Sequence, residues 1–200
     1  MNAAMTVLQK SLECSQAEIK ALREEVLRAR NESLIESLTD LANRRAFDQQ
    51  LAVCVAVAQI GLSAQTLCLV TADIDHFKPV NDTYSHSFGD QVLRAVAQLL
   101  KACSGQHHIA ARTGGEEFAI LLPQVALPDA NTLVEKIRSA VSRSHIRRQG
   151  AEETLAKVTL SLGVTLYRMG EEVGKFLDRA DRALYASKSG GRERVTVMAT

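Results

Sequence analysis

The sequence lacks any run of about 18 uncharged apolar residues, and no secretory-signal pattern opens it. We therefore expect no membrane segment in this chain and a cytoplasmic location. It also lacks an excess of either charge, because the formal net charge of the 200 residues is +1. Such a chain has no overall field that would favour nucleic acid or an anionic membrane, so phosphate binding has to be local. We expect no nucleic-acid partner.

Clustered cysteines are absent as well. Cys14, Cys54, Cys68 and Cys103 are scattered singly without metal-ligand spacing, which fits a reducing compartment and buried or bystander thiols. Internal repeats and low-complexity tracts are also lacking. The composition that is present, 46% hydrophobic and 24% charged residues, is typical of a well-packed globular domain with an appendage.

The first 37 residues predict the appendage. From Met5 to about Glu36, apolar or small residues recur at alternating steps of three and four, which is the a/d stripe of roughly four heptads. A helix packed on its own domain is one interpretation. The narrow stripe, with charges of both signs on the other faces, favours a parallel coiled coil. The stripe consists of Met5, Leu8, Leu12, Ser15, Ile19, Leu22, Val26, Ala29 and Ser33.

Residues 38–200 predict an α/β sandwich (α+β) whose mixed antiparallel sheet is flanked by helices, close to a ferredoxin-like or palm arrangement. The expected elements are a helix that Thr39 caps and that reaches about Gln59, strands over Thr66–Asp75, Lys157–Tyr167 and Arg194–Met198, a polar turn-rich segment over Phe77–Asp90, and helices over Gln91–Ala102, Asp129–Ser144 and Gly174–Ser187.

A hairpin is expected between the helices Gln91–Ala102 and Asp129–Ser144. The pair Gly114–Gly115 separates the short apolar runs Ile109–Ala111 and Phe118–Leu122. This pattern predicts a two-residue type I′ turn with positive φ at both glycines. Two carboxylates, Glu116 and Glu117, follow the turn. They are either a polar tip wetted by water or part of a divalent-cation site, and a converging acid elsewhere would favour the site.

Such an acid lies at the end of the expected strand Thr66–Asp75. Asp73 and Asp75 are two residues apart, so in an extended chain their side chains point to the same side. An Asp at a strand end is more often a turn residue. In combination with the hairpin acids, however, the Asp-x-Asp pair favours a site at the edge of the sheet.

Five spaced blocks of the sequence resemble one family, the GGDEF-domain diguanylate cyclases. Gly114–Phe118 is similar to its signature in the GGEEF form, and Asp73–Asp90 follows its pattern DIDxFKxxNDxxGHxxGD. Leu38–Arg44 resembles its opening block, whereas Ser161–Val164 and Ala180–Arg192 resemble its closing blocks. The resemblance covers most of the chain after residue 37.

This resemblance implies that two GTP molecules condense to cyclic di-GMP and two pyrophosphates, each 3′-hydroxyl attacking the α-phosphorus of the other nucleotide. The implied cofactor is Mg²⁺, with Mn²⁺ as an alternative, because anionic triphosphates and hard oxygen ligands suit these ions. The implied ligands are Asp73, the carbonyl of Ile74 and Glu116, with Glu117 beside them. Glu116 is also the implied base for the 3′-hydroxyl, although a metal ion could lower the pKa of that hydroxyl unaided.

The same matching implies which residues bind the substrate. Lys78, Lys188 and Arg192 would neutralise the triphosphate and the leaving pyrophosphate, helped by backbone N–H groups near Phe77. Lys78 thereby joins the two hairpin glutamates as an implied catalytic residue.

Guanine is implied to be read by Asn81 and Asp90, with Leu41 lining the base pocket. A carboxylate can accept hydrogen bonds from guanine N1–H and from the 2-amino group together, a donor pair that adenine does not offer. Asp90 has an alternative role as the N-cap of a helix that begins at Gln91, and it could fill both.

The sequence departs from the family pattern at two positions. Ser85 stands at a glycine position, and a positive φ there would strain the loop by about 1 kcal/mol or less. Gly105–His108 lacks the Arg-x-x-Asp of members under product feedback, so we expect no primary inhibitory site there. Glu36 stands where the family often has an acid and preserves the charge.

Each domain can hold one GTP, whereas the reaction joins two, so two half-sites have to face each other. We therefore expect a homodimer joined by the coiled coil of residues 1–37, which also receives the signal, with the cyclase domain over residues 38–200. The alternative functions are a catalytically silent domain that binds GTP or cyclic di-GMP, and a coiled-coil adaptor. The sequence does not identify the input signal.

Overall fold

The computed structural model describes residues 9–10, 12–13, 15–20, 22, 34–60, 66–144, 146–147 and 154–199. The chain divides into two compact units, Met1–Ile35 and Glu36–Thr200. In the first unit, the described residues between 9 and 22 are helical, and Leu12, Ile19 and Leu22 of the expected stripe are exposed. No helix within the described ranges combines the length and the apolar character needed to cross a bilayer.

Only part of the predicted N-terminal helix can be compared with the structure. Its stripe positions at 5, 8, 26, 29 and 33 lie outside the described residues, and so does Gly61, the expected end of the next helix. Residues 34–36 are described and are not helical, so the prediction that the first helix reaches Glu36 was wrong.

A turn anchored by Glu36 opens the second unit. Its carboxylate accepts hydrogen bonds from the N–H of Thr39 at 2.9 Å and from the hydroxyl of Thr39 at 2.6 Å. Thr39 is therefore a turn residue and not the predicted helix cap. Helix α2 (Arg44–Ile60) is capped by Asn43, whose Oδ1 accepts the N–H of Ala46 at 3.0 Å.

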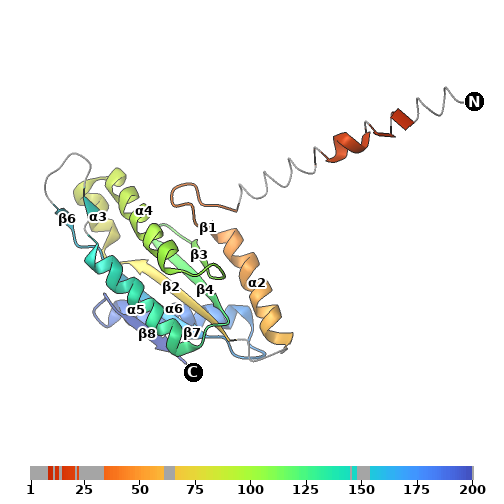
Figure 1. Ribbon diagram of the computed structural model, residues 1–200. Coiled ribbons are helices and arrows are strands. Elements are labelled where there is room, and N and C mark those ends of the chain that lie inside the picture. The colour runs from red at the N-terminus through yellow and green to blue at the C-terminus, as the bar shows by residue number, and fades with distance from the viewer. Residues whose placement is uncertain are drawn as a thin grey trace, which may run out of the picture. The chain divides into compact units, whose positions relative to one another are not determined.

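A six-stranded mixed sheet is the centre of the second unit (Figure 1), in the order β1-β3-β4-β2-β7-β8. The four central strands are antiparallel to one another, while the edge strands β1 and β8 pair in parallel with β3 and β7. This arrangement confirms the predicted α/β sandwich with a mixed antiparallel sheet. The strands are β1 (Ala42–Asn43), β2 (Leu67–Ile74), β3 (Ile109–Arg112), β4 (Glu117–Pro123), β7 (Leu160–Leu166) and β8 (Val195–Met198).

Helices cover both faces of this sheet (Figure 1). Helices α4 (His86–Cys103) and α5 (Leu127–Arg143) lie on one face, whereas α2 and α6 (Val173–Ser189) lie on the other. All eight residues of β2 are buried as a result. A strand covered on both faces reads as a continuous apolar run, which is why the sequence identified β2 as central.

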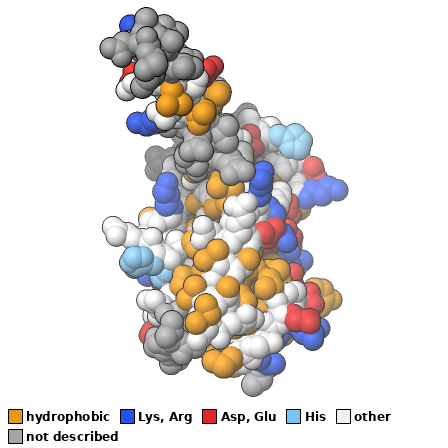
Figure 2. Space-filling view, turned by 90° about the vertical axis from the view of Figure 1, so that its right-hand side faces the viewer, with side chains coloured by type: hydrophobic (Ala, Val, Ile, Leu, Met, Phe, Trp, Pro, Cys, Tyr) orange, Lys and Arg blue, Asp and Glu red, His pale blue; other side chains and the backbone are white. Residues whose placement is uncertain are grey.

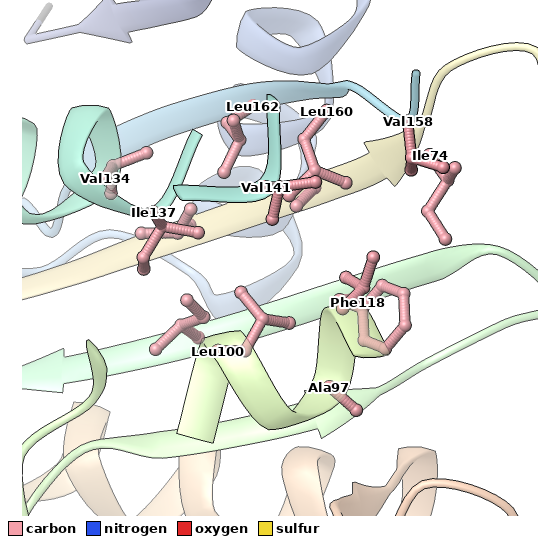
Figure 3. Close-up of a cluster of buried hydrophobic side chains, with 14 of the residues drawn as sticks. Ile74, Ala97, Leu100, Phe118, Val134, Ile137, Val141, Val158, Leu160 and Leu162 are labelled. Atoms are coloured by element: carbon pink, nitrogen blue, oxygen red, sulfur yellow. The ribbon is translucent and has the colours of Figure 1, made fainter. Parts of the chain in front are cut away.

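Apolar side chains from several helices and strands form the core beneath α4 and α5 (Figure 3). Burial of each large apolar side chain contributes about 1.5–3 kcal/mol, so this cluster fixes where β2 and β4 end relative to each other. Its labelled members include Ile74 of β2, Phe118 of β4, Leu100 of α4, Leu160 and Leu162 of β7, and Val134, Ile137 and Val141 of α5.

Helix α6 approaches β7 unusually closely. A Cβ atom at Gly163 would lie 2.3 Å from the backbone N of Leu184 and 2.5 Å from the carbonyl O of Ala180, so only glycine fits there. The Ser187 hydroxyl donates to the Leu162 carbonyl at 2.7 Å. These contacts fix the C-terminal turn of α6 against the sheet.

Helix α2 exposes apolar residues on the face away from the sheet. Phe47, Leu51 and Val55 are buried, as the sequence predicted, and they pack on the sheet. Val57 and Ile60 are nevertheless 46% and 68% exposed, and Figure 2 shows apolar side chains gathered on this side of the molecule. The helix is therefore apolar on both of its faces.

The segment Phe77–Asp90 was predicted as irregular and is instead mostly helical. Helix α3 spans Phe77–Tyr84, and α4 begins at His86, so Asp90 lies inside a helix and does not cap one. The missed signal is Pro79, which is compatible with the first turn of a helix. A short two-stranded sheet of β5 (Ile146–Arg147) and β6 (Thr154–Ala156) was also not predicted.

Ser85, between α3 and α4, is strained. Its φ of 106° and ψ of 158° fall in a region that is essentially reserved for glycine and that costs other residues about 1–3 kcal/mol. The sequence predicted a strained loop if φ of Ser85 were positive, and φ is positive here.

We predict that Ser85→Gly stabilises the protein by about 1 kcal/mol, the relief of strain being partly offset by the greater entropy of the unfolded chain. Thermal unfolding would then shift upward by about 2–4 °C. Ser87→Gly is the matched control, because Ser87 forms the other half of a 2.9 Å hydroxyl pair with Ser85 but lies within α4. A Tm that rises equally in both variants, or in neither, would contradict the strain.

Candidate functional site

The hairpin that carries the glutamate pair differs in detail from its prediction. Its strands β3 and β4 are joined by four residues, 113–116, and neither Gly114 nor Gly115 has a positive φ, so the type I′ prediction was wrong. A longer connection does not require that turn. A Cβ atom at Gly114 would lie 2.5 Å from Oε2 of Glu117, so a larger residue there would displace the carboxylate of Glu117.

Pairing between β2 and β4 brings acids from distant segments together. Asp73 lies directly opposite Glu117 in the antiparallel register, which places both side chains on one face of the sheet. The N–H of Ile74 donates to the carbonyl of Glu116 at 3.3 Å. The structure therefore places Asp73, Ile74 and both glutamates at one end of the two central strands.

A lysine from α6 completes this group. The Nζ atom of Lys188 lies 2.6 Å from Oδ2 of Asp73, which is only 6% exposed. An ammonium at this distance compensates part of the negative charge that three neighbouring carboxylates would otherwise concentrate.

The carboxylates remain mutually repelling despite Lys188. Burial raises the pKa of Asp73, the hydrogen bond and charge of Lys188 oppose this, and the charges of Glu117 and Asp75 raise it further. Burial also raises the pKa of Glu116, as do the charges of Asp73 and Glu117. Raised carboxylate pKa values beside one another are typical of functional sites, where an added cation relieves the conflict.

Asp75 does not join this group, although the sequence paired it with Asp73. Its Oδ1 atom accepts the Ser161 hydroxyl at 2.6 Å, and its Oδ2 atom accepts the Thr159 hydroxyl at 2.7 Å and the N–H of Glu193 at 3.1 Å. Three donors thus occupy this carboxylate. Its role is to join the end of β2 to neighbouring segments.

The donor set fits a hard divalent cation that is shared with a substrate. Within the described residues, no group of three or more His, Cys, Asp or Glu side chains is arranged to hold an ion. Mg²⁺ is usually bound by one or two carboxylates together with substrate phosphates, so a complete protein cage is not required. Asp73, the Ile74 carbonyl and the hairpin glutamates are the residues that would hold it.

The N-terminus of α3 adjoins this acidic end of the sheet. Phe77 and Lys78 occupy the first turn of this helix, where backbone N–H groups have no intrahelical acceptor and attract anions. The side chains of Lys78 and Arg192 are exposed. These positions are compatible with the phosphate-binding roles that the resemblance implies.

Asn81 of α3 holds a buried acceptor that has no partner. Its Oδ1 atom makes no hydrogen bond with any described residue, and a Cβ atom at Gly89 would lie only 1.9 Å from it. Buried polar atoms are rarely left unsatisfied, so this one fits a ligand donor. Asp90 follows Gly89 in α4, which places both proposed guanine-reading residues where α3 packs on α4.

Leu41 is 4% exposed and belongs to the buried apolar cluster that also contains Phe77 of α3 and Phe88 of α4. It lines a cavity of about 430 Å³, together with Lys101, Gly105 and His108. A second cavity, of about 270 Å³, is lined by Glu117 and Lys188 on the α2 and α6 side of the sheet.

Arg112 contacts the hairpin loop of this site and was not predicted from the sequence. Its Nη2 atom donates to the carbonyl of Gly115 at 2.8 Å, and its Nη1 atom lies 3.1 Å from Oε1 of Glu36. Arg112 therefore connects the hairpin loop to the turn that opens the domain. A cation two residues before the glycine pair was the available signal.

Fold and site together define an α/β domain with an acidic sheet end beside a helix N-terminus. The family model described as "Diguanylate cyclase, GGDEF domain" matches residues 33–194. The chain belongs to this GGDEF family, as its sequence motifs predicted.

Curated relatives include diguanylate cyclases. The chain is 34% identical over 188 residues to diguanylate cyclase VdcA of Vibrio cholerae, covering 94% of this chain and 54% of the relative. It is 42% identical over 138 residues to diguanylate cyclase A of Treponema denticola, covering 68% of this chain and 36% of the relative. The chain thus spans about half or less of the length of these relatives.

Solved structures resemble the chain over nearly its whole length. The coiled coil and GGDEF domain of DgcB from Caulobacter crescentus, in complex with c-di-GMP, matches with a TM-score of 0.88 and 42% identity, covering 96% of this chain and 99% of that one. Diguanylate cyclase SiaD of Pseudomonas aeruginosa, in complex with its activator SiaC, matches with a TM-score of 0.79 and 33% identity, covering 98% and 73%.

We predict that Lys188→Met raises the pKa of Asp73 further, because burial and the neighbouring carboxylates then act unopposed. A pH titration of the carboxyl carbon signals by NMR measures this change. Lys175→Met is the control, since Lys175 is an exposed α6 lysine whose ion-pair partner is Glu172. An Asp73 titration that is identical in Lys188→Met and in the parent protein would refute the coupling.

Proposed function

We propose that the chain is a diguanylate cyclase that condenses two GTP molecules to cyclic di-GMP and two pyrophosphates. The observation that carries this proposal is the convergence of Asp73 with Glu116 and Glu117 beside the N-terminus of α3. Membership in the GGDEF family and the diguanylate cyclases among its relatives support it.

Phosphate binding is assigned to the residues around the acidic end. The first-turn N–H groups of α3 at Phe77 and Lys78, together with the side chains of Lys78, Lys188 and Arg192, neutralise the triphosphate. Lys188 has to exchange part of its contact with Asp73 for the phosphates. Asp73, the Ile74 carbonyl and the glutamates would hold a Mg²⁺ ion, which would supply positive charge to the phosphates and lower the pKa of the attacking hydroxyl.

Glu116 is the proposed proton acceptor for the 3′-hydroxyl. Burial and the charges of Asp73 and Glu117 raise its pKa, which strengthens it as a base relative to an ordinary glutamate. Glu117 lies on the same strand end and is exposed, so it remains available for the shared cation.

Guanine recognition is assigned to Asn81 and Asp90. The unpartnered Oδ1 atom of Asn81 is free to accept a donor of the base, and the Asp90 carboxylate suits the N1–H and 2-amino pair. Leu41 is assigned to the wall of the base pocket, because it packs in the apolar cluster that contains Phe77 of α3 and Phe88 of α4.

Two copies of the chain are proposed to act together, because one domain holds one GTP. A coiled coil of the N-terminal helix would raise the effective concentration of the second half-site. The exposed Leu12, Ile19 and Leu22 support this assignment, since a single helix gives them no apolar partner of their own.

We predict that the protein incubated with GTP and Mg²⁺ releases pyrophosphate and cyclic di-GMP. Asp73→Asn and Glu117→Gln should each reduce the rate at least about a hundredfold, because the charge that holds the cation is removed. The control Asp129→Asn should retain the parent rate, since Asp129 is exposed in the first turn of α5.

The same assay distinguishes the alternative functions. Binding of GTP without turnover in the parent protein would support a receptor, whereas neither binding nor turnover would support an adaptor. Equal rates in the parent protein and in Asp73→Asn would contradict the proposed site.

Product inhibition through residues 105–108 is not expected. The N–H of Gly105 donates to Nδ1 of His108 at 2.9 Å, and burial, together with the charge of His107, lowers the pKa of His108. A neutral imidazole engaged in its own turn lacks the charge that a guanidinium would offer to the phosphates of cyclic di-GMP.

We predict that cyclic di-GMP at micromolar concentration does not inhibit through this turn, measured as the initial rate of pyrophosphate release. Gln106→Ala and His108→Ala should leave any dependence on product unchanged. Micromolar inhibition that either substitution abolishes would show this prediction to be wrong.

A further inference from the structure

The turn that follows α6 is held in an unfavourable backbone conformation. Gly191, Arg192 and Glu193 have φ values of 115°, 62° and 46°, so three successive residues have positive φ and two of them are not glycine. Each non-glycine residue in the left-handed region costs about 1 kcal/mol or more, and such a conformation persists only where surrounding contacts impose it.

The side chain of Glu193 supplies such contacts. Its Oε1 atom accepts the hydroxyl of Ser142 in α5 at 2.5 Å, and its Oε2 atom lies 3.0 Å from Nζ of Lys157. The guanidinium of Arg138, also in α5, lies 4.0 Å from the same carboxylate. Hydrogen bonds from Ser142 and Lys157 lower the pKa of Glu193, so it is ionised at neutral pH.

The backbone of Glu193 is tied to the end of β2. Its N–H donates to Oδ2 of Asp75 at 3.1 Å, and Asp75 is two residues after Asp73. On the other side of the turn, the N–H of Arg192 donates to the carbonyl of Ser187 in α6 at 3.0 Å. One short segment therefore joins α5, α6 and the strand that carries the acidic end.

Arg192 is one of the strained residues of this turn, so the position of its side chain depends on the geometry of the turn. Arg192 immediately precedes Glu193, and its own side chain is exposed. Without support, an exposed arginine on a strained turn would have to be ordered when an anion binds, at a cost in affinity. A fixed turn removes most of that cost in advance.

We propose that Glu193 is a positioning residue that holds the turn after α6 so that Arg192 faces the triphosphate of the nucleotide. It acts through Arg192 and does not touch the substrate. This inference rests on the proposed function, which assigns Arg192 to the triphosphate. It predicts that Glu193 contributes to binding of the phosphates and not of the base.

Binding of 3′-deoxy-GTP and of GMP to the full chain tests this, in the presence of Mg²⁺ and by calorimetry or NMR. The first probe lacks the attacking hydroxyl, so it binds without turnover, and the second lacks the β- and γ-phosphates. Glu193→Ala should weaken binding of 3′-deoxy-GTP by about fivefold to tenfold and leave that of GMP within about twofold. With GTP, KM should rise while kcat stays within about twofold.

A second variant alters a contact of the same turn through a residue of α5. Ser142→Ala removes the hydroxyl that donates to Glu193 and should weaken triphosphate binding in the same sense. The double variant should show less than the sum of the two single effects, because both act on one contact. Asp129→Asn is the control, because Asp129 is an exposed residue in the first turn of α5, at the opposite end of this helix from Ser142.

The outcomes separate this inference from the proposed function. Arg192→Ala with unchanged triphosphate affinity would overturn the assignment of Arg192 itself. Weaker binding in Arg192→Ala but unchanged binding in both Glu193→Ala and Ser142→Ala would overturn only the positioning role. Equal loss of 3′-deoxy-GTP and GMP binding in Glu193→Ala would also overturn it, because a general loss of stability affects both ligands.

Discussion

Antiparallel pairing of β2 with β4 is the constraint on which the site depends. Seven residue pairs align the two strands, and the last of them sets Asp73 opposite Glu117. A slip of one residue would send every side chain of one strand to the other face of the sheet and separate these acids. The register is fixed because both faces are buried, by α4 and α5 on one side and by α2 and α6 on the other.

Much of this could be predicted from the sequence, because the signals are local or carried by motifs. The apolar run of β2, the buried face of α2 and the presence of the hairpin, although not its turn type, each follow from periodicity or composition, and the observed order of elements confirms the expected sheet. The residue types already favoured a shared site for Asp73 and the hairpin glutamates, but no local pattern specifies which strands pair, so the family motif was needed to place them together.

Features set by tertiary contacts were missed. Helix α3 was read as turns because Asn81, Asp82 and Thr83 have low helix propensity, and packing of Phe77 on the core overrides that preference. Thr39 has the residue type of a cap, but Glu36 engages its side chain. Asp73 joins the acidic group whereas Asp75 does not, because Asp75 is hydrogen-bonded to Thr159 and Ser161. These two residues are more than 80 positions away along the chain.

Gly163 is a sensitive position of the fold that lies outside the group of acids. A single methyl group at this position would push against the backbone of Leu184 and Ala180, and α6 would have to move outward as a rigid rod. Since α6 carries Lys188, the ammonium would leave Asp73 together with it. Natural variation should therefore spare this residue as strictly as the acids themselves, although it carries no side chain that could act on a substrate.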